Sequence, residues 1–197
     1  MNVIVRFDKE IIGLTSLEIL LHCLKSVREN ETYWQWIYIS LHSAVQAYMV
    51  LALTGSNSLL TYKTKDMQNW LNSYYNNSAL PECKLDFFEE LYKKTKSSDF
   101  EFYTITKVFV PSPRQDMSIC HLNKKRNDFV HFIQDSLILI IDESPFQLVE
   151  DCLDYIDFLA FKSNNIIWFE EHNKSETERL LSECRSTIDS LSEVTQS

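Results

Sequence analysis

Residues 32–54 read TYWQWIYISLHSAVQAYMVLALT and are expected to form one helix, and they contain the most apolar stretch of the chain, from Trp34 to Leu53. Apolar and small side chains recur there at helical spacing in one wide stripe, which consists of Trp36, Ile39, Ser40, Ser43, Ala44, Ala47 and Leu51. Gly55 follows directly, and glycine commonly stands just past the end of a helix. A buried core helix is favoured over a membrane span because polar residues interrupt the stretch, among them Gln35, His42, Ser43 and Gln46.

Helical patterns continue on both sides of this core helix. They predict helices over about residues 15–30, 65–75, 85–96, 146–161 and 175–191. The chain has only two glycines and four prolines, far fewer turn residues than a β-sandwich or barrel needs. We therefore expect an all-α, up-and-down helical bundle. No internal repeat or linker is visible, so residues 1–197 are assigned to a single domain.

The stretch between residues 99 and 141 is less regular. Residues 99–115 are rich in β-branched and aromatic side chains, but a single strand would have no partner, so we expect an extended packing segment or a short helix. A further helix is expected to begin near Asp116 or Ser118 and to end near Gln134. The LILII run at 137–141 either extends that helix or forms a buried extended piece.

Residues 122–132 of this helix read LNKKRNDFVHF and contain the strongest candidate motif. Arg126 is followed by Asn127 and, after four intervening residues, by His131. This pattern resembles the HEPN superfamily, whose active members are helical bundles carrying an Arg, often a following polar residue, and a His. The chain is longer than a minimal four-helix HEPN unit, so the resemblance implies a HEPN-like bundle with additional helices. Arg114 and His121 also fit the spacing, but Arg114 precedes the expected start of the helix.

The chemistry of the same side chains also suggests a function. Asn127 and His131 are four positions apart and share a helix face, and the long side chain of Arg126 reaches toward the same side. A histidine exchanges protons near neutral pH, and an arginine holds a phosphate through two donors. The expected chemistry is RNA cleavage without a metal or cofactor, in which His131 transfers the proton and Arg126 grips the phosphate. Asn127 orients the imidazole or contacts phosphate, and Lys124 and Lys125 contact flanking phosphates.

Charge and cysteine content limit the possible partners. The net charge is −9, so the chain is poorly suited to coat RNA or DNA, and only a local contact with RNA is expected, with none to DNA. Five scattered cysteines without a CxxC pair favour reduced thiols and give no support for a zinc site. No secretory signal pattern is recognised at the N-terminus, so we expect a cytoplasmic protein without membrane association.

Two functional hypotheses follow. The first is a metal-independent endoribonuclease, either a toxin or a phage-defence effector, and the HEPN resemblance implies a homodimer and a possible nucleotidyltransferase-like antitoxin as partner. The second is a non-catalytic helical dimer that binds or regulates another protein, in which Arg126 and His131 form a structural network, for example with Asp128. A bundle that binds a small molecule in its aromatic interior is a third option. His42, on the apolar core helix, is expected to be a buried structural histidine.

Overall fold

The computed structural model describes residues 4–5, 7–101, 105–131 and 136–195. These residues form seven α-helices and no β-strand, which confirms the predicted all-α helical bundle. Short 3-10 turns (η1, Leu59–Thr61, and η2, Ser98–Phe100) and a π-helical turn (η3, Phe158–Lys162) complete the regular structure.

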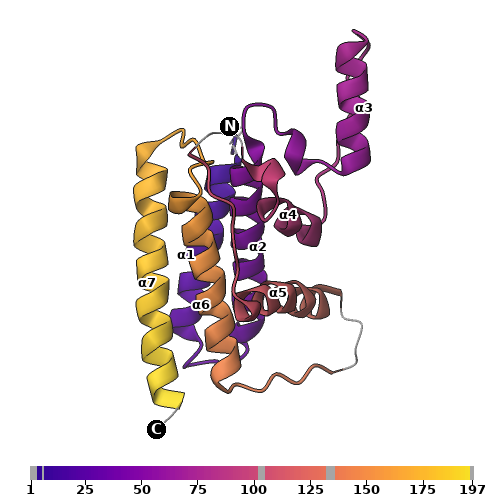
Figure 1. The fold of residues 1–197 in the computed structure, drawn as a ribbon. Coiled ribbons are helices and arrows are strands. Elements are labelled where there is room, and N and C mark those ends of the chain that lie inside the picture. The colour runs from indigo at the N-terminus through magenta and orange to yellow at the C-terminus, as the bar shows by residue number, and fades with distance from the viewer. Residues whose placement is uncertain (1–3, 6, 102–104, 132–135, 196–197) are drawn as a thin grey trace.

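Two antiparallel helical hairpins make up the bundle (Figure 1). Helices α1 (Lys9–Ser26) and α2 (Tyr33–Thr54) form the first, and α6 (Glu143–Asp157) and α7 (Glu171–Thr195) form the second. The contacts close a ring, because α1 packs on α2 and α7, and α6 packs on α7 and α2. A long crossover with three helices joins the hairpins, so α2 and α6 run in the same direction (Figure 1).

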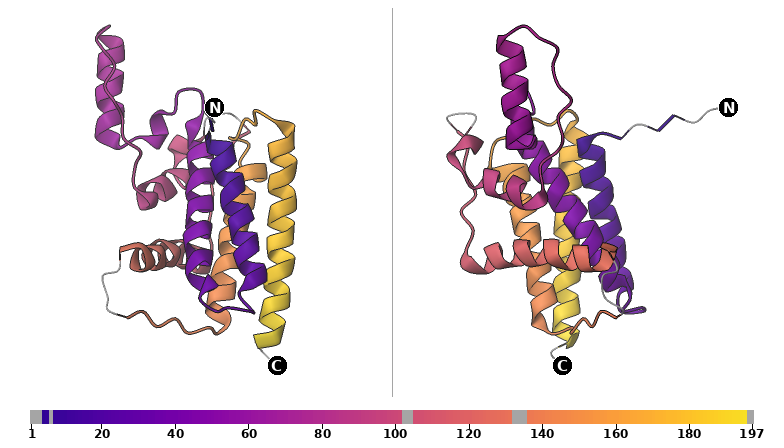
Figure 2. Two further views of the ribbon diagram at one scale, coloured as in Figure 1. Left: turned by 180° about the vertical axis from the view of Figure 1, so that it is seen from behind. Right: turned by 90° about the vertical axis from the view of Figure 1, so that its right-hand side faces the viewer.

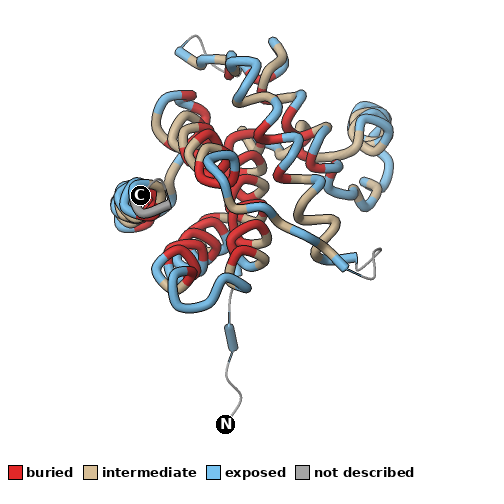
Figure 3. Tube along the Cα trace, turned by 90° about the horizontal axis from the view of Figure 1, so that it is seen from below, coloured by how far each residue is buried: buried red, intermediate tan, exposed pale blue. Residues whose placement is uncertain are grey.

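Helix α2 is the centre of the core. It contacts α1, α4, α5 and α6, and the buried residues line the facing sides of these helices (Figure 3). Its length and mean hydropathy of 1.4 would also suit a membrane span, but 72% of the apolar window is buried inside the protein. The predicted buried core helix is therefore present. The exposed side chain of Trp36 lies outside the buried face, because the packing partners surround the other sides of the helix.

The ends of the helices follow local capping chemistry. Gly55 ends α2 with a positive φ of 47°, a conformation that glycine adopts at little cost. Helix α1 begins well before the expected residue 15, because the carboxylate of Asp8 caps it by accepting the backbone N–H of Ile11 at 3.0 Å. Asp142 caps α6 in the same way, with its carboxylate 2.8 Å from the backbone nitrogen of Ser144.

In the first half of the crossover, α3 (Thr64–Tyr75) projects away from the bundle and has no buried residue (Figure 2). Helix α4 (Phe88–Thr95) packs against α2. Hydrogen bonds join the segments that precede and follow α3, where the backbone nitrogen of Asp86 donates to the carbonyl of Thr61 at 2.9 Å. The ammonium group of Lys94 also bonds to both segments, because it donates to the carbonyl of Tyr62 at 2.7 Å and to the carboxylate of Asp86 at 2.6 Å.

Helix α5 (Pro113–His131) lies across the helices of the bundle rather than along them (Figures 1 and 2). The expected start at Asp116 or Ser118 is wrong, because Pro113 opens the helix at the first position, where its missing N–H is not needed. The expected end near Gln134 lies outside the described residues. Residues 137–141 are irregular rather than helical, and the described part of 99–115 contains η2, an irregular stretch and the start of α5.

Candidate active site on helix α5

Two polar faces lie on opposite sides of α5. Successive helical residues are rotated by about 100°, so side chains four positions apart share a face. Asn123, Asn127 and His131 form one such set. The opposite set consists of Arg114, Ser118, His121 and Lys125. Between the two, Ile119 and Leu122 are fully buried and attach the helix to the bundle.

The first polar face opens on a pocket of about 560 Å³, which we call the α4–α5 pocket. Arg126, Asn127 and His131 line it from α5, and the other walls are His42 and Gln46 of α2 together with residues 86–90. The three residues predicted for catalysis thus contribute to a single pocket. His131 is the last residue of α5 and is exposed to solvent, which leaves its imidazole accessible to a ligand.

Arg126 is held by its neighbour in sequence. Its Nη1 donates a hydrogen bond to Oδ1 of Asn127 at 2.9 Å. Among the described residues, no carboxylate forms an ion pair with Arg126, so the structural pairing with Asp128 considered above is not observed. The amide of Asn127 therefore positions the guanidinium, and the remaining guanidinium donors stay available to an anion.

A second imidazole, that of His42, borders the same pocket from α2. It is buried, stacks on the ring of Phe88 with centroids 4.3 Å apart, and its Nε2 lies 3.1 Å from Oδ1 of Asn123. The pKa of His42 is lowered to about 4, mainly by burial and also by the positive charge of Arg126, against the opposing effect of the hydrogen bond to Asn123. His42 is thus neutral near pH 7. The sequence predicts that His42 is a buried structural histidine, and His42 is indeed buried. Its position in the same pocket as Arg126 is not predicted.

Asn123 connects this imidazole to α4. Its Nδ2 donates to Oε1 of Glu89 at 3.1 Å, so Oδ1 is left as the acceptor and the Nε2–H of His42 is the donor. Asn123 is absent from the predicted site, although its position four residues before Asn127 places it on the same helix face. Glu89 has no comparable sequence signal, because its proximity arises only from the packing of α4 against α5.

The α4–α5 pocket also has three carboxylates on its rim. Asp86 is paired with Lys94 and Glu90 with Lys93, each at 2.6 Å, so two of the three charges are balanced locally. Glu89 forms no ion pair among the described residues and is bonded only to the neutral amide of Asn123. An anionic ligand that enters the pocket therefore meets one unbalanced negative charge opposite Arg126.

The predicted phosphate-contacting lysines do not lie in the α4–α5 pocket. Lys124 is exposed on the solvent side of α5, and Lys125 lines a separate pocket on the opposite face. The side chains of Arg114 and His121 line that second pocket as well. The prediction that Arg114 precedes the helix is wrong, since Arg114 and His121 both lie within α5.

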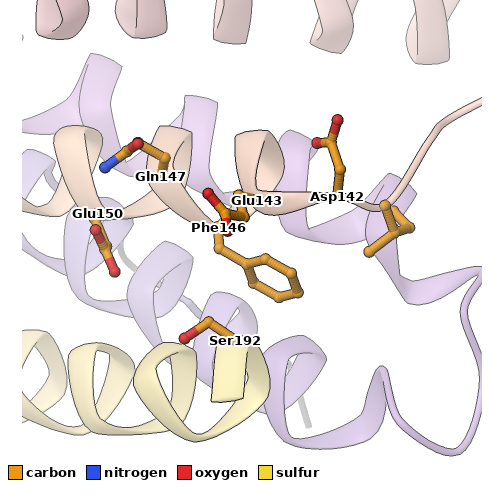
Figure 4. Close-up of a pocket in the computed structure, with 7 residues that line it drawn as sticks. Asp142, Glu143, Phe146, Gln147, Glu150 and Ser192 are labelled. Atoms are coloured by element: carbon orange, nitrogen blue, oxygen red, sulfur yellow. The ribbon is translucent and has the colours of Figure 1, made fainter. Parts of the chain in front are cut away.

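A larger pocket of about 680 Å³ lies between α6 and the C-terminal part of α7 (Figure 4). Carboxylates from Asp142, Glu143 and Glu150 dominate its lining, together with Phe146 and Ser192. Burial raises the pKa of Glu150, and the neighbouring charge of Asp189 raises it further. No cation lines this pocket in the described part of the chain, so its electrostatics oppose the binding of a phosphodiester.

Arg126, Asn127 and His131 thus share one pocket on a helix of an all-α bundle. No protein-family model matches the chain, and no curated protein or solved structure matches it.

Proposed function

We propose that the protein is a metal-independent endoribonuclease whose catalytic centre is the α4–α5 pocket. The observation that carries this proposal is that Arg126, Asn127 and His131 line a single pocket, with Arg126 not engaged by any described carboxylate. Phosphodiester cleavage requires a cation that binds the phosphate and a group that transfers a proton. The pocket brings both kinds of group together.

The chemistry uses the ribose itself as nucleophile. The imidazole of His131 removes the proton from a 2′-hydroxyl, and the resulting oxygen attacks the adjacent phosphorus. The bond between phosphorus and the 5′-oxygen breaks, and that oxygen takes up a proton. The products are a 2′,3′-cyclic phosphate and a 5′-hydroxyl. The Arg126 guanidinium binds the non-bridging oxygens, where negative charge grows during the attack, and Asn127 keeps the guanidinium in position.

Two proton transfers need two groups, and His131 supplies one of them. His42 is neutral, but its Nε2–H is already engaged by Asn123, which favours a positioning role. The HEPN resemblance implies a homodimer, in which a second copy of the pocket supplies the other imidazole. We propose such a dimer, acting in the cytoplasm on RNA as a toxin or defence effector, with a nucleotidyltransferase-like antitoxin as its possible protein partner.

The test is cleavage of a defined single-stranded RNA by the purified full chain in the presence of EDTA. We expect His131→Ala to lower the rate by about 10²–10⁴-fold, the usual contribution of a positioned proton-transfer group. His172→Ala is the matched control, because His172 is an exposed histidine on α7, outside the pocket. The folded state of each variant is checked by its thermal midpoint. Cleavage that requires a divalent metal, or equal rates for the two variants, would refute the proposal.

A specific observation supports the second candidate, a non-catalytic module that binds another protein. Glu89 leaves an unbalanced negative charge in the pocket, and the chain as a whole carries a net charge of −9. Both features oppose RNA and suit a basic protein surface. In that case wild type and His131→Ala would have the same effect on RNA, while Glu89→Gln would weaken capture of the protein partner. Under the nuclease proposal, Glu89→Gln instead lowers the KM for RNA, because it removes a repulsive charge.

A further inference from the structure

The face of α5 opposite the α4–α5 pocket opens on a second pocket of about 510 Å³, which we call the α5–α6 pocket. Arg114, His121 and Lys125 line it at spacings of seven and four residues, which gives one basic stripe along the helix. Lys125 is adjacent in sequence to Arg126, yet the two side chains line different pockets. The proposed nuclease centre uses none of the residues in this stripe.

Arg114 is fixed in place by a buried anchor. Its Nε and Nη2 donate to Oδ1 of Asp151 at 3.2 and 2.9 Å, and the hydroxyl of Ser118 donates to Oδ2 of the same carboxylate at 2.7 Å. Asp151 is fully buried, whereas the Arg114 side chain is 56% exposed. The Nη1 of Arg114 donates to no described residue. This arrangement presents a preorganised donor to an anion in the pocket.

Part of the remaining lining of the α5–α6 pocket is apolar and comes from residues 138–140, where Ile138 and Ile140 are 82% and 73% exposed. The carboxylate of Asp142 also lines the pocket, but it is engaged as the cap of α6 by the backbone N–H of Ser144. Exposed aliphatic side chains opposite a basic stripe provide two different surfaces, one for a flat apolar ring and one for a phosphate. A nucleotide has both parts. Single strands are usually bound by cationic contacts to the backbone and by side chains that cover the flat faces of the bases, and here aliphatic side chains provide the second surface.

Helix α5 carries a net positive charge in this acidic chain. Arg114, Lys124, Lys125 and Arg126 all lie on this helix. Of its two acidic residues, Asp116 is bonded to Lys96 at 2.6 Å, which leaves only Asp128 without an ion pair among the described residues. By helical spacing, Lys124 lies on the solvent side of α5, between the faces that open on the two pockets. A polyanion that crosses α5 from one pocket to the other therefore passes over Lys124.

We propose that the α5–α6 pocket is a second subsite, which holds a nucleotide that flanks the scissile phosphodiester of single-stranded RNA. The flanking phosphate binds Lys125, His121 and the free edge of Arg114, and the base lies against Ile138 and Ile140. Lys124 contacts the connecting backbone. This inference rests on the proposed endoribonuclease function, and it adds that the substrate must be a single strand long enough to cross α5.

The test measures binding separately from cleavage. The probe is a fluorescent 2′-O-methyl oligouridylate of 12 nucleotides, which lacks the nucleophilic hydroxyl, and its affinity for the full chain is measured by anisotropy over a range of salt concentrations. Each phosphate contact to a single strand contributes about 0.7 to the slope of log affinity against log salt concentration. We expect Lys125→Gln to reduce this slope by about 0.7 and to weaken binding about fivefold. The matched control is Lys25→Gln, an exposed lysine on α1, which should change neither.

A second variant tests the contribution of the apolar residues to probe binding separately from that of the basic residues. Ile140→Ser should weaken binding of the 12-nucleotide probe about threefold while leaving the salt slope unchanged, because it removes an apolar contact and no charge. Arg114 is left intact in these tests, since its removal would leave the buried Asp151 carboxylate without its cation.

The possible outcomes distinguish this inference from the proposed function. Probe binding that depends on Lys125, in a protein that cuts no RNA, supports the second subsite and refutes the nuclease. Cleavage that depends on His131, with the same salt slope in wild type, Lys125→Gln and Lys25→Gln, supports the nuclease and overturns the second subsite. Failure of the wild-type chain to bind the 12-nucleotide probe at low salt overturns the subsite as well.

Discussion

In the bundle, α2 buries fourteen of its 22 residues, whereas in the crossover α5 buries three of its 19 and α3 buries none. The bundle is held mainly by aliphatic and aromatic contacts. The crossover is attached by fewer buried apolar side chains, such as Ile119 and Leu122, and also by the polar anchor from Arg114 to Asp151. This difference explains why the candidate chemistry lies on α5, because a helix with few buried residues keeps most of its side chains available for ligands.

The largest stability effect should come from the bundle. Leu41 is completely buried on α2, so Leu41→Ala should lower the free energy of unfolding by about 3–4 kcal/mol through lost burial and the cavity left behind. The matched change in the crossover is Leu85→Ala, at a side chain that is 42% exposed, and it should cost less than about 1 kcal/mol. Urea unfolding measures both. Equal losses would mean that the crossover is as tightly packed as the bundle.

The next largest effect on stability depends on pH and involves His42 of α2, which contacts Asn123 of the crossover. The pKa of His42 is lowered to about 4 in the folded protein, against an ordinary value of 6.5. Between these values the unfolded chain binds a proton that the folded protein does not, so acidification favours unfolding. The stabilising effect of neutral His42 is thus present above pH 6.5 and lost as the pH falls toward 4. A shift of this size corresponds to about 3 kcal/mol.

The measurement compares wild type with His42→Gln by urea unfolding at several pH values. Carboxylates such as Asp116 also have lowered pKa values and lose stability in acid, but they do so in both proteins. The difference between the two curves therefore isolates His42. Parallel curves between pH 6.5 and 4 would show that the imidazole is not held neutral by its burial.

The difference between the bundle and the crossover also determines how much of the structure can be predicted from the sequence. Helix α2 and its end at Gly55 follow from periodicity and a terminal glycine, because a helix that is buried on most sides carries a strong local pattern. The start of α5 is predicted too late, at Asp116 or Ser118, although Pro113 is a residue that favours the first helical position. The shared face of Asn127 and His131 is predictable from spacing. The contact of His42 with Asn123 is not, because it joins residues 81 positions apart.

A smaller loss is expected from the anchor that joins α5 to α6. Arg114→Ala would leave the buried carboxylate of Asp151 with only the Ser118 hydroxyl, and we expect a cost of about 2 kcal/mol, since Arg114 itself is partly exposed to solvent. Arg185→Ala is the matched control within the bundle, because its partner Asp154 is 47% exposed, and it should cost less than about 1 kcal/mol.

A second substitution at this anchor tests the mechanism. Asp151→Asn in the Arg114→Ala background should recover part of the lost stability, because a neutral amide costs less to bury than an unpaired carboxylate. If the double variant is no more stable than Arg114→Ala alone, the loss does not arise from the buried charge, and the polar attachment of α5 is weaker than its geometry implies.

The smallest effect should come from α3. Tyr75 is 76% exposed at the end of this helix, so Tyr75→Ala should change the free energy of unfolding by less than about 0.5 kcal/mol. Backbone amides of α3 should exchange hydrogen through local opening, far faster than those of α2, which exchange only when the bundle unfolds. Strong protection of α3 that increases with protein concentration would contradict this, because it would mean that a second copy covers the projecting helix. The division between a packed bundle and a polar crossover would then describe the single chain but not its assembly.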